Sequence, residues 1–151
     1  MGCFMTKVQR FRQLEQMAEH ACDKAGRELG EAQDNHSKEQ EQLKQLTGFF
    51  DEYRERFNNA GATGMNARQL GDFRAFFGQL DNAIESQRQT LVGLGAKVTE
   101  RQTLWIEKHQ RTQSLSQALV QVQKEQLVQR NKREQKEQDE RSGLASKDGW
   151  G

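Results

Sequence analysis

One long heptad repeat constrains the fold of this chain more than any other feature. From Leu70 to Val122, the positions that would face a partner helix recur in alternating steps of three and four residues. A spacing that averages about 3.5 residues keeps one narrow row of side chains, the seam, turned toward the partner helix. A helix with only this row to bury cannot enclose a ligand, so the pattern predicts a long helix that contacts other helices. The predicted seam consists of Leu70, Phe73, Phe77, Leu80, Ile84, Gln87, Leu91, Leu94, Val98, Arg101, Trp105, Lys108, Thr112, Leu115, Leu119 and Val122.

A second repeat precedes the first and predicts another helix over about residues 5–57. Its steps also alternate between three and four, except between Leu14 and Cys22, where two steps of four predict a local loosening of the supercoil. The two repeats together predict two long helices rather than an ordinary globular core. The seam expected on this helix consists of Phe11, Leu14, Ala18, Cys22, Ala25, Leu29, Ala32, His36, Glu39, Leu43, Leu46, Phe50, Tyr53 and Phe57.

The residues between the two repeats predict a turn over 58–66. This segment is rich in asparagine and glycine, which tolerate turns and positive φ. Asn66 is a suitable N-cap, and Gln69, three residues later, completes a capping box. We therefore expect the second helix to run from about residue 67 to about residue 141, followed by a disordered tail over 142–151.

The fold predicted from these elements is all-α, with two long helices forming an antiparallel coiled-coil hairpin over residues 1–141. Folding the chain back at the turn suggests a register in which large side chains meet small ones, such as Trp105 with Ala18. In this register the helix beyond Val122 has no partner. A parallel homodimer is the alternative arrangement. The register would also place Phe50 opposite Phe73, Leu46 opposite Phe77, His36 opposite Gln87 and Glu39 opposite Ile84.

Composition and motifs argue against an enzyme. The chain has no proline to break a long helix, and its net charge of +1 gives no general attraction to nucleic acid. No P-loop motif is present, and His20, His36 and His109 lie too far apart along a hairpin to share one metal. Cys3 and Cys22 are too few for a disulfide framework, which suits a reducing, cytosolic compartment. We expect no catalytic activity, cofactor or metal, and no run of residues is apolar enough to span a membrane.

The first six residues match the loose pattern for myristoylation of Gly2. The same residues also suit an ordinary helix end. An acylated protein at a membrane surface is therefore kept as the weakest of three functional hypotheses.

Near the turn, the sequence has more apolar side chains than a two-stranded seam can cover. On the first helix, Gln42, Leu46, Phe49 and Tyr53 follow one another at helical spacing, and Phe76, Leu80, Ala83 and Gln87 repeat that spacing on the second helix. Both rows are rotated from the seam toward one side. They either thicken the turn end of the hairpin or form a docking surface for a partner.

Parts of the sequence around the turn resemble the flagellar FliJ family. The resemblance rests on residues 51–54 and 76–88, is extended by 105–108 and Arg111, and covers roughly Phe11 to Val122. It implies a soluble component of the flagellar type III export apparatus, with a coiled-coil fold similar to the central stalk of rotary ATPases. Such a protein is cytoplasmic, associates with the export ATPase ring, the cytoplasmic domain of the export gate and export chaperones, and reaches the membrane only through these partners.

The resemblance also implies a site. The gate-binding surface of the family falls on the two rows described above, with Phe49 where a tyrosine is often found and Gln87 where a histidine is. The unpaired end of the second helix would lie in the pore of the ATPase ring, with Lys124, Arg130, Lys132 and Arg133 as candidate contacts. The alternative is a generic coiled-coil scaffold or tether that has no ATPase partner.

Overall fold

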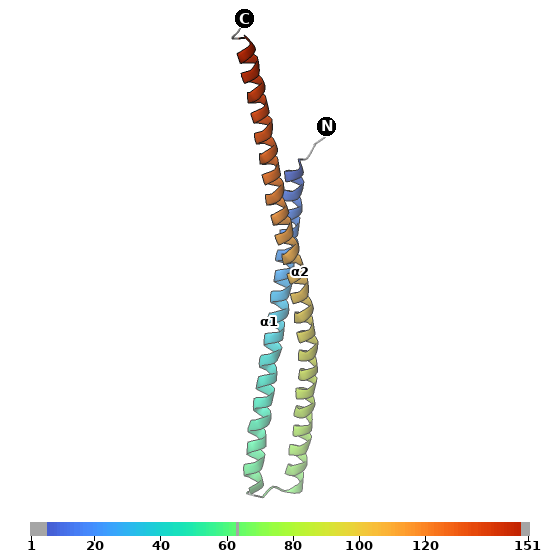
Figure 1. Ribbon diagram of the computed structural model, residues 1–151. Helices are drawn as coiled ribbons and strands as arrows, with labels where there is room; N and C mark the ends of the chain where they lie inside the picture. The colour runs from blue at the N-terminus through green and yellow to red at the C-terminus, as the bar shows by residue number, and fades with distance from the viewer. Residues whose placement is uncertain (1–5, 63, 149–151) are drawn as a thin grey trace. The chain divides into compact units, whose positions relative to one another are not determined.

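The chain forms two long helices in the computed structural model, which describes residues 6–62 and 64–148 (Figure 1). Helix α1 spans Lys7–Ala62 and helix α2 spans Ala67–Asp148. The chain divides into two compact units, and each contains part of both helices. The turn unit is formed by Lys24–Trp105, and the terminal unit by Met1–Asp23 with Ile106–Gly151. In each unit α1 and α2 pack against each other in opposite directions, as predicted for an antiparallel hairpin.

Both helices begin with a capping box. At the start of α2, the backbone N–H of Gln69 donates to Asn66 Oδ1 at 2.8 Å, and the N–H of Asn66 donates to Gln69 Oε1 at 3.3 Å. Thr6 and Gln9 make the same reciprocal pair at the start of α1, at 3.2 and 3.0 Å. Each box satisfies two N–H groups that have no partner inside the helix. The predicted cap at Asn66 is confirmed.

The connection between the helices is shorter than the sequence suggested. Helix α1 continues to Ala62 rather than ending near Phe57, because asparagine and glycine tolerate a turn without requiring one. The chain reverses at Gly64, whose φ of 84° favours glycine, and whose N–H donates to the Gly61 carbonyl at 3.4 Å. The predicted turn over 58–66 therefore narrows to the few residues before α2.

Helix α2 extends to Asp148, so most of the predicted tail over 142–151 is helical. The residues before this end are rich in Glu, Gln, Lys and Arg, which have high helix propensity, and no proline interrupts them. Residues 149–151 lie outside the described part of the chain, and so does Gly2 with its acylation pattern. Within the described ranges, neither helix has a stretch long and apolar enough to cross a membrane.

The seam predicted for α2 is confirmed, since every one of its positions is buried or half-buried. The seam of α1 differs at one point in the terminal unit. Glu15 is half-buried there, with one carboxylate oxygen buried and without a hydrogen bond, whereas Leu14 is 41% exposed. The heptad of α1 therefore runs without the predicted loosening, because an unbroken seam on α2 requires an unbroken seam on its partner. The most deeply buried apolar side chains are Ala18, Ala25, Ala32, Ile84 and Val122.

The predicted register is wrong by one heptad. In the turn unit, Phe73 packs on Phe57 at 5.5 Å between ring centroids, seven positions along α1 from the expected partner Phe50. The amide of Gln87 bonds to Glu39 rather than facing His36. Since the seam repeats every seven residues, a shift of one heptad preserves its pattern, and the short connection selects this register.

Candidate partner-binding surface

The two rows predicted near the turn lie on one edge of the turn unit, which we call the aromatic edge. The inner residues of this edge are half-buried in the seam, and they are Leu46, Tyr53, Leu80 and Gln87. The outer residues of this edge are exposed, and they are Gln42, Phe49, Phe76 and Ala83. The rows of the two helices meet where the Tyr53 and Phe76 rings contact each other, with centroids 4.7 Å apart. The structure therefore brings together residues that are distant in the sequence.

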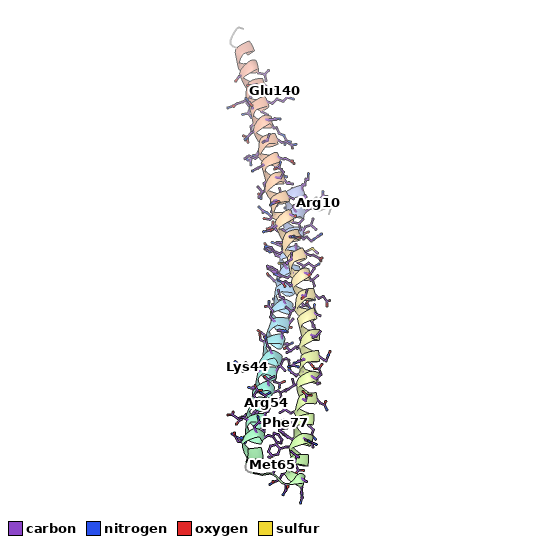
Figure 2. The ribbon with its side chains drawn as sticks, turned by 60° about the horizontal axis from the view of Figure 1, so that its bottom comes forward. Arg10, Lys44, Arg54, Met65, Phe77 and Glu140 are labelled. Carbon is purple, nitrogen blue, oxygen red and sulfur yellow. The ribbon has the colours of Figure 1, made fainter. Side chains whose placement is uncertain are left out.

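A cluster of phenylalanines supports this edge from inside. Phe77 lies between the helices near the turn, as Figure 2 shows, and its ring is 5.6 Å from that of Phe50 and 5.8 Å from that of Phe57. Aromatic pairs at these separations add roughly 0.5–1.5 kcal/mol each beyond the area they bury. Phe49 makes none of the ring contacts among the described residues and is 52% exposed. The interior of the turn end is filled without Phe49.

A shallow apolar hollow lies on the aromatic edge. Its volume is about 170 Å³, and Tyr53, Asp72, Phe73 and Phe76 line it. The Arg56 guanidinium lies 5.4 Å from the centroid of the Tyr53 ring, and bonds to Glu52 at 3.1 Å. Sequence reasoning missed Asp72 as part of this surface. The sequence feature that could have identified Asp72 is its spacing, since it precedes Phe76 by one helical turn.

The inner residues of the aromatic edge are less accessible than the outer residues. Gln87 Nε2 donates to the Glu39 backbone carbonyl at 2.8 Å and to Glu39 Oε2 at 2.5 Å. The second bond gives one oxygen of the Glu39 carboxylate a partner, whereas the predicted register had placed Glu39 opposite Ile84. Gln87 therefore helps to join the helices, and the exposed aromatic side chains are the more accessible part of the edge.

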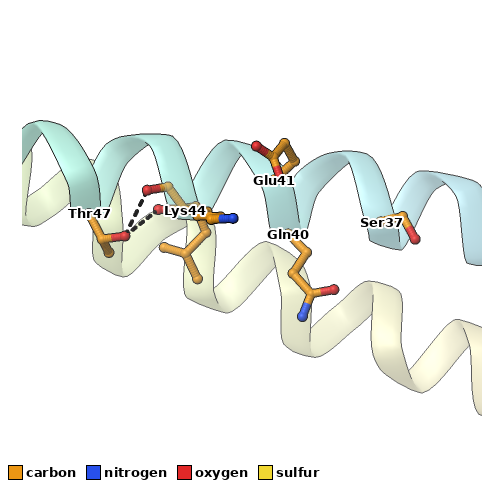
Figure 3. Close-up of a pocket in the computed structure, with 6 residues that line it drawn as sticks. Ser37, Gln40, Glu41, Lys44 and Thr47 are labelled. Carbon is orange, nitrogen blue, oxygen red and sulfur yellow. Dashed lines mark hydrogen bonds between the residues drawn. The ribbon is translucent and has the colours of Figure 1, made fainter.

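A larger hollow of about 450 Å³ lies on α1, lined by Ser37, Gln40, Glu41, Leu43, Lys44 and Thr47 (Figure 3). All these residues belong to a single helix. The Thr47 hydroxyl lies 3.0 Å from the Leu43 carbonyl oxygen and 2.9 Å from that of Lys44, which are local bonds along the helix. No nucleophile is paired with a base in this hollow. Among the described residues, no group of three or more His, Cys, Asp or Glu side chains could hold a metal ion.

The candidate ATPase contacts lie in the terminal unit. Lys124, Arg130, Lys132 and Arg133 are exposed, as are all side chains described from Gln123 to Leu144. Arg130 Nε pairs with Glu134 at 3.4 Å, an ion pair along the helix surface. Within this unit α2 continues past the first residues of α1 (Figure 1). The segment from Gln123 to Leu144 therefore presents exposed charged side chains on more than one face of α2.

Three comparisons place the chain among known proteins. Residues 6–148 match the family model described as "Flagellar FliJ protein". The flagellar FliJ protein of Salmonella typhi is 32% identical over 127 residues, which cover 84% of this chain and 86% of that protein. The protein of the same name from Escherichia coli (strain K12) is 31% identical over the same lengths. No solved structure gives a significant match.

Proposed function

Since the chain belongs to the FliJ family of flagellar proteins, we propose that it is a stalk-like component of the flagellar type III export apparatus. In this proposal its terminal unit binds the ring of the export ATPase, and the aromatic edge binds the cytoplasmic domain of the export gate. It interacts with export chaperones and reaches the membrane from the cytoplasm through its partners. It acts as an adaptor, without chemistry of its own.

The exposed aromatic side chains are the observation that carries this proposal. Phe49 is 52% exposed and Phe76 is 38% exposed, on neighbouring helices of the same unit. Leaving large apolar side chains in water forgoes roughly 25 cal/mol for each Å² that could be buried. Such side chains, clustered beside half-buried apolar neighbours, are typical of a surface that a partner covers.

The terminal unit supports the second contact. Its basic side chains between Gln123 and Leu144 are exposed, in a helix segment where the structure describes none of them as buried. Exposed charges contribute little to folding but guide association with an oppositely charged surface. A contact of this kind is weak and sensitive to salt, as suits a stalk that must not be fixed rigidly in a ring.

The gate contact is tested by replacing both exposed rings, in the double variant Phe49→Ala with Phe76→Ala. We expect binding to the cytoplasmic domain of the cognate gate protein to weaken by more than about tenfold, because aromatic anchors dominate binding energy. Isothermal titration calorimetry gives the affinity. Circular dichroism at 222 nm checks that helix content is retained.

Val92→Ala is the matched control. Val92 is 69% exposed on α2, within the same unit but off the aromatic edge. We expect this variant to bind the gate domain like the unchanged protein. Unchanged binding by the double phenylalanine variant would contradict the assignment of the edge to the gate.

A further inference from the structure

We propose that the hollow beside Tyr53 receives an arginine or lysine side chain of the gate protein, with its positive charge facing Asp72. This inference rests on the proposed function, and adds the chemistry of the group that the edge recognises. The hollow is lined by Tyr53, Asp72, Phe73 and Phe76 and has a volume of about 170 Å³. The exposed lining of this shallow hollow is apolar and suits the stem of a single side chain, and Asp72 places a carboxylate beside it.

The aromatic lining suits a cation that carries an apolar stem. A guanidinium or ammonium group within about 6 Å of a ring centroid is attracted by the negative face of the ring, while its methylene groups cover apolar surface. The molecule already shows this interaction, because the Arg56 guanidinium lies 5.4 Å from the centroid of the Tyr53 ring. Because Arg56 is itself paired with Glu52 at 3.1 Å, its charge is offset, and a second cation can approach the hollow from the partner.

Asp72 supplies the complementary charge. It is exposed and takes no part in the ion pairs of the described turn unit, which join Arg54 to Asp51, Arg56 to Glu52 and Arg101 to Glu28. A carboxylate covered by a partner without a counter-ion loses hydration and gains nothing in return. A partner cation seated beside the hollow would pair with Asp72.

The same reasoning disfavours other occupants. A carboxylate of the partner would be repelled by the negative charge of Asp72. The nearby Arg56 guanidinium would not offset this repulsion, because it is already paired with Glu52. A purely apolar side chain would also fill the hollow, but it would leave the neighbouring Asp72 carboxylate without a counter-ion. A cation with an apolar stem meets both requirements.

The test compares Asp72→Asn with Asp51→Asn, using the full chain and the cytoplasmic domain of the gate protein. Each substitution removes one negative charge, but Asp51 is paired with Arg54 at 3.9 Å and does not line the hollow. We expect Asp72→Asn to raise the Kd roughly fivefold and to weaken the dependence of binding on salt. Asp51→Asn should change the Kd by less than about twofold.

Charge exchange gives a second readout. Asp72→Lys should weaken binding further, and should restore the affinity of a gate domain in which the contacting arginine or lysine is replaced by glutamate. The gate variants are made at each of its exposed basic residues in turn. Restoration of at least one of them by Asp72→Lys supports the inference.

The outcomes separate this inference from the proposed function. If Asp72→Asn binds like Asp51→Asn while Phe49→Ala with Phe76→Ala weakens binding, the inference is wrong and the gate contact stands. If Asp72→Lys restores no gate variant, the inference is also wrong. If the unchanged protein does not bind the gate domain, both proposals fail.

Discussion

At the scale of single residues, the sequence predicted what depends on neighbours in the chain. Asn66 and Gln69 form the expected capping box because both partners lie within one helical turn. The position of Trp105 was not predictable in this way. Its indole lies 3.3 Å from where a Cβ at Gly26 would be, whereas the sequence suggested Ala18 as its neighbour. The fit of a large side chain against a glycine depends on the register, which local patterns do not determine.

Gly26 and Gly30 allow a matched test of this packing. Both glycines lie on α1, but nothing lies within 4 Å of a Cβ at Gly30. We expect Gly30→Leu to stabilise the protein by about 0.5–1 kcal/mol, because leucine favours the helix over glycine. Gly26→Leu should instead destabilise it by about 1–3 kcal/mol through overpacking against Trp105. Urea denaturation gives both free energies, and equal effects of the two substitutions would contradict the contact.

At the scale of helices, the repeat was predictable and the pairing was not. The seam of α2 is as expected over its whole length, since burial there follows the spacing of apolar residues. Glu15 takes the seam position that was predicted for Leu14, because the regular steps of the heptad determine which side chain faces the partner helix, even where that side chain is polar. Two registers that differ by one heptad bury the same positions. Which of them forms therefore depends on where the chain turns back, which is at Gly64.

The charged end of α2 carries a prediction about the ATPase. Replacing Lys124, Arg130, Lys132 and Arg133 with glutamine should weaken binding to the cognate export ATPase about tenfold at low salt, since each exposed charge contributes roughly 0.2–1 kcal/mol. A pull-down at increasing salt measures this. The matched control replaces Lys38, Lys44, Arg74 and Arg88, which are also exposed but lie in the turn unit. An equal loss in both variants would show a general charge effect rather than a contact by α2.

At the scale of the whole molecule, the reversal of the chain at Gly64 creates the candidate site. Spacing alone selected the eight residues of the aromatic edge, but only the contact between Tyr53 and Phe76 joins the two rows into one surface. The hollow with Asp72 arises from this contact, which explains why no linear motif revealed it. Spacing also selected Gln87 for this surface, but the Gln87 amide bonds to Glu39 and joins the two helices of the hairpin.

The distance between spin labels at Phe49→Cys and Phe76→Cys tests this reversal most directly. The labels are placed in a chain whose native cysteines are replaced by serine, diluted with unlabelled protein so that only distances within one chain are observed. We expect a separation of roughly 15–25 Å, because packed helix axes lie about 8–10 Å apart and the labels add their own length. If α1 and α2 instead formed one continuous helix, the labels would be roughly 40 Å apart. That longer distance would contradict the hairpin, and with it the aromatic edge.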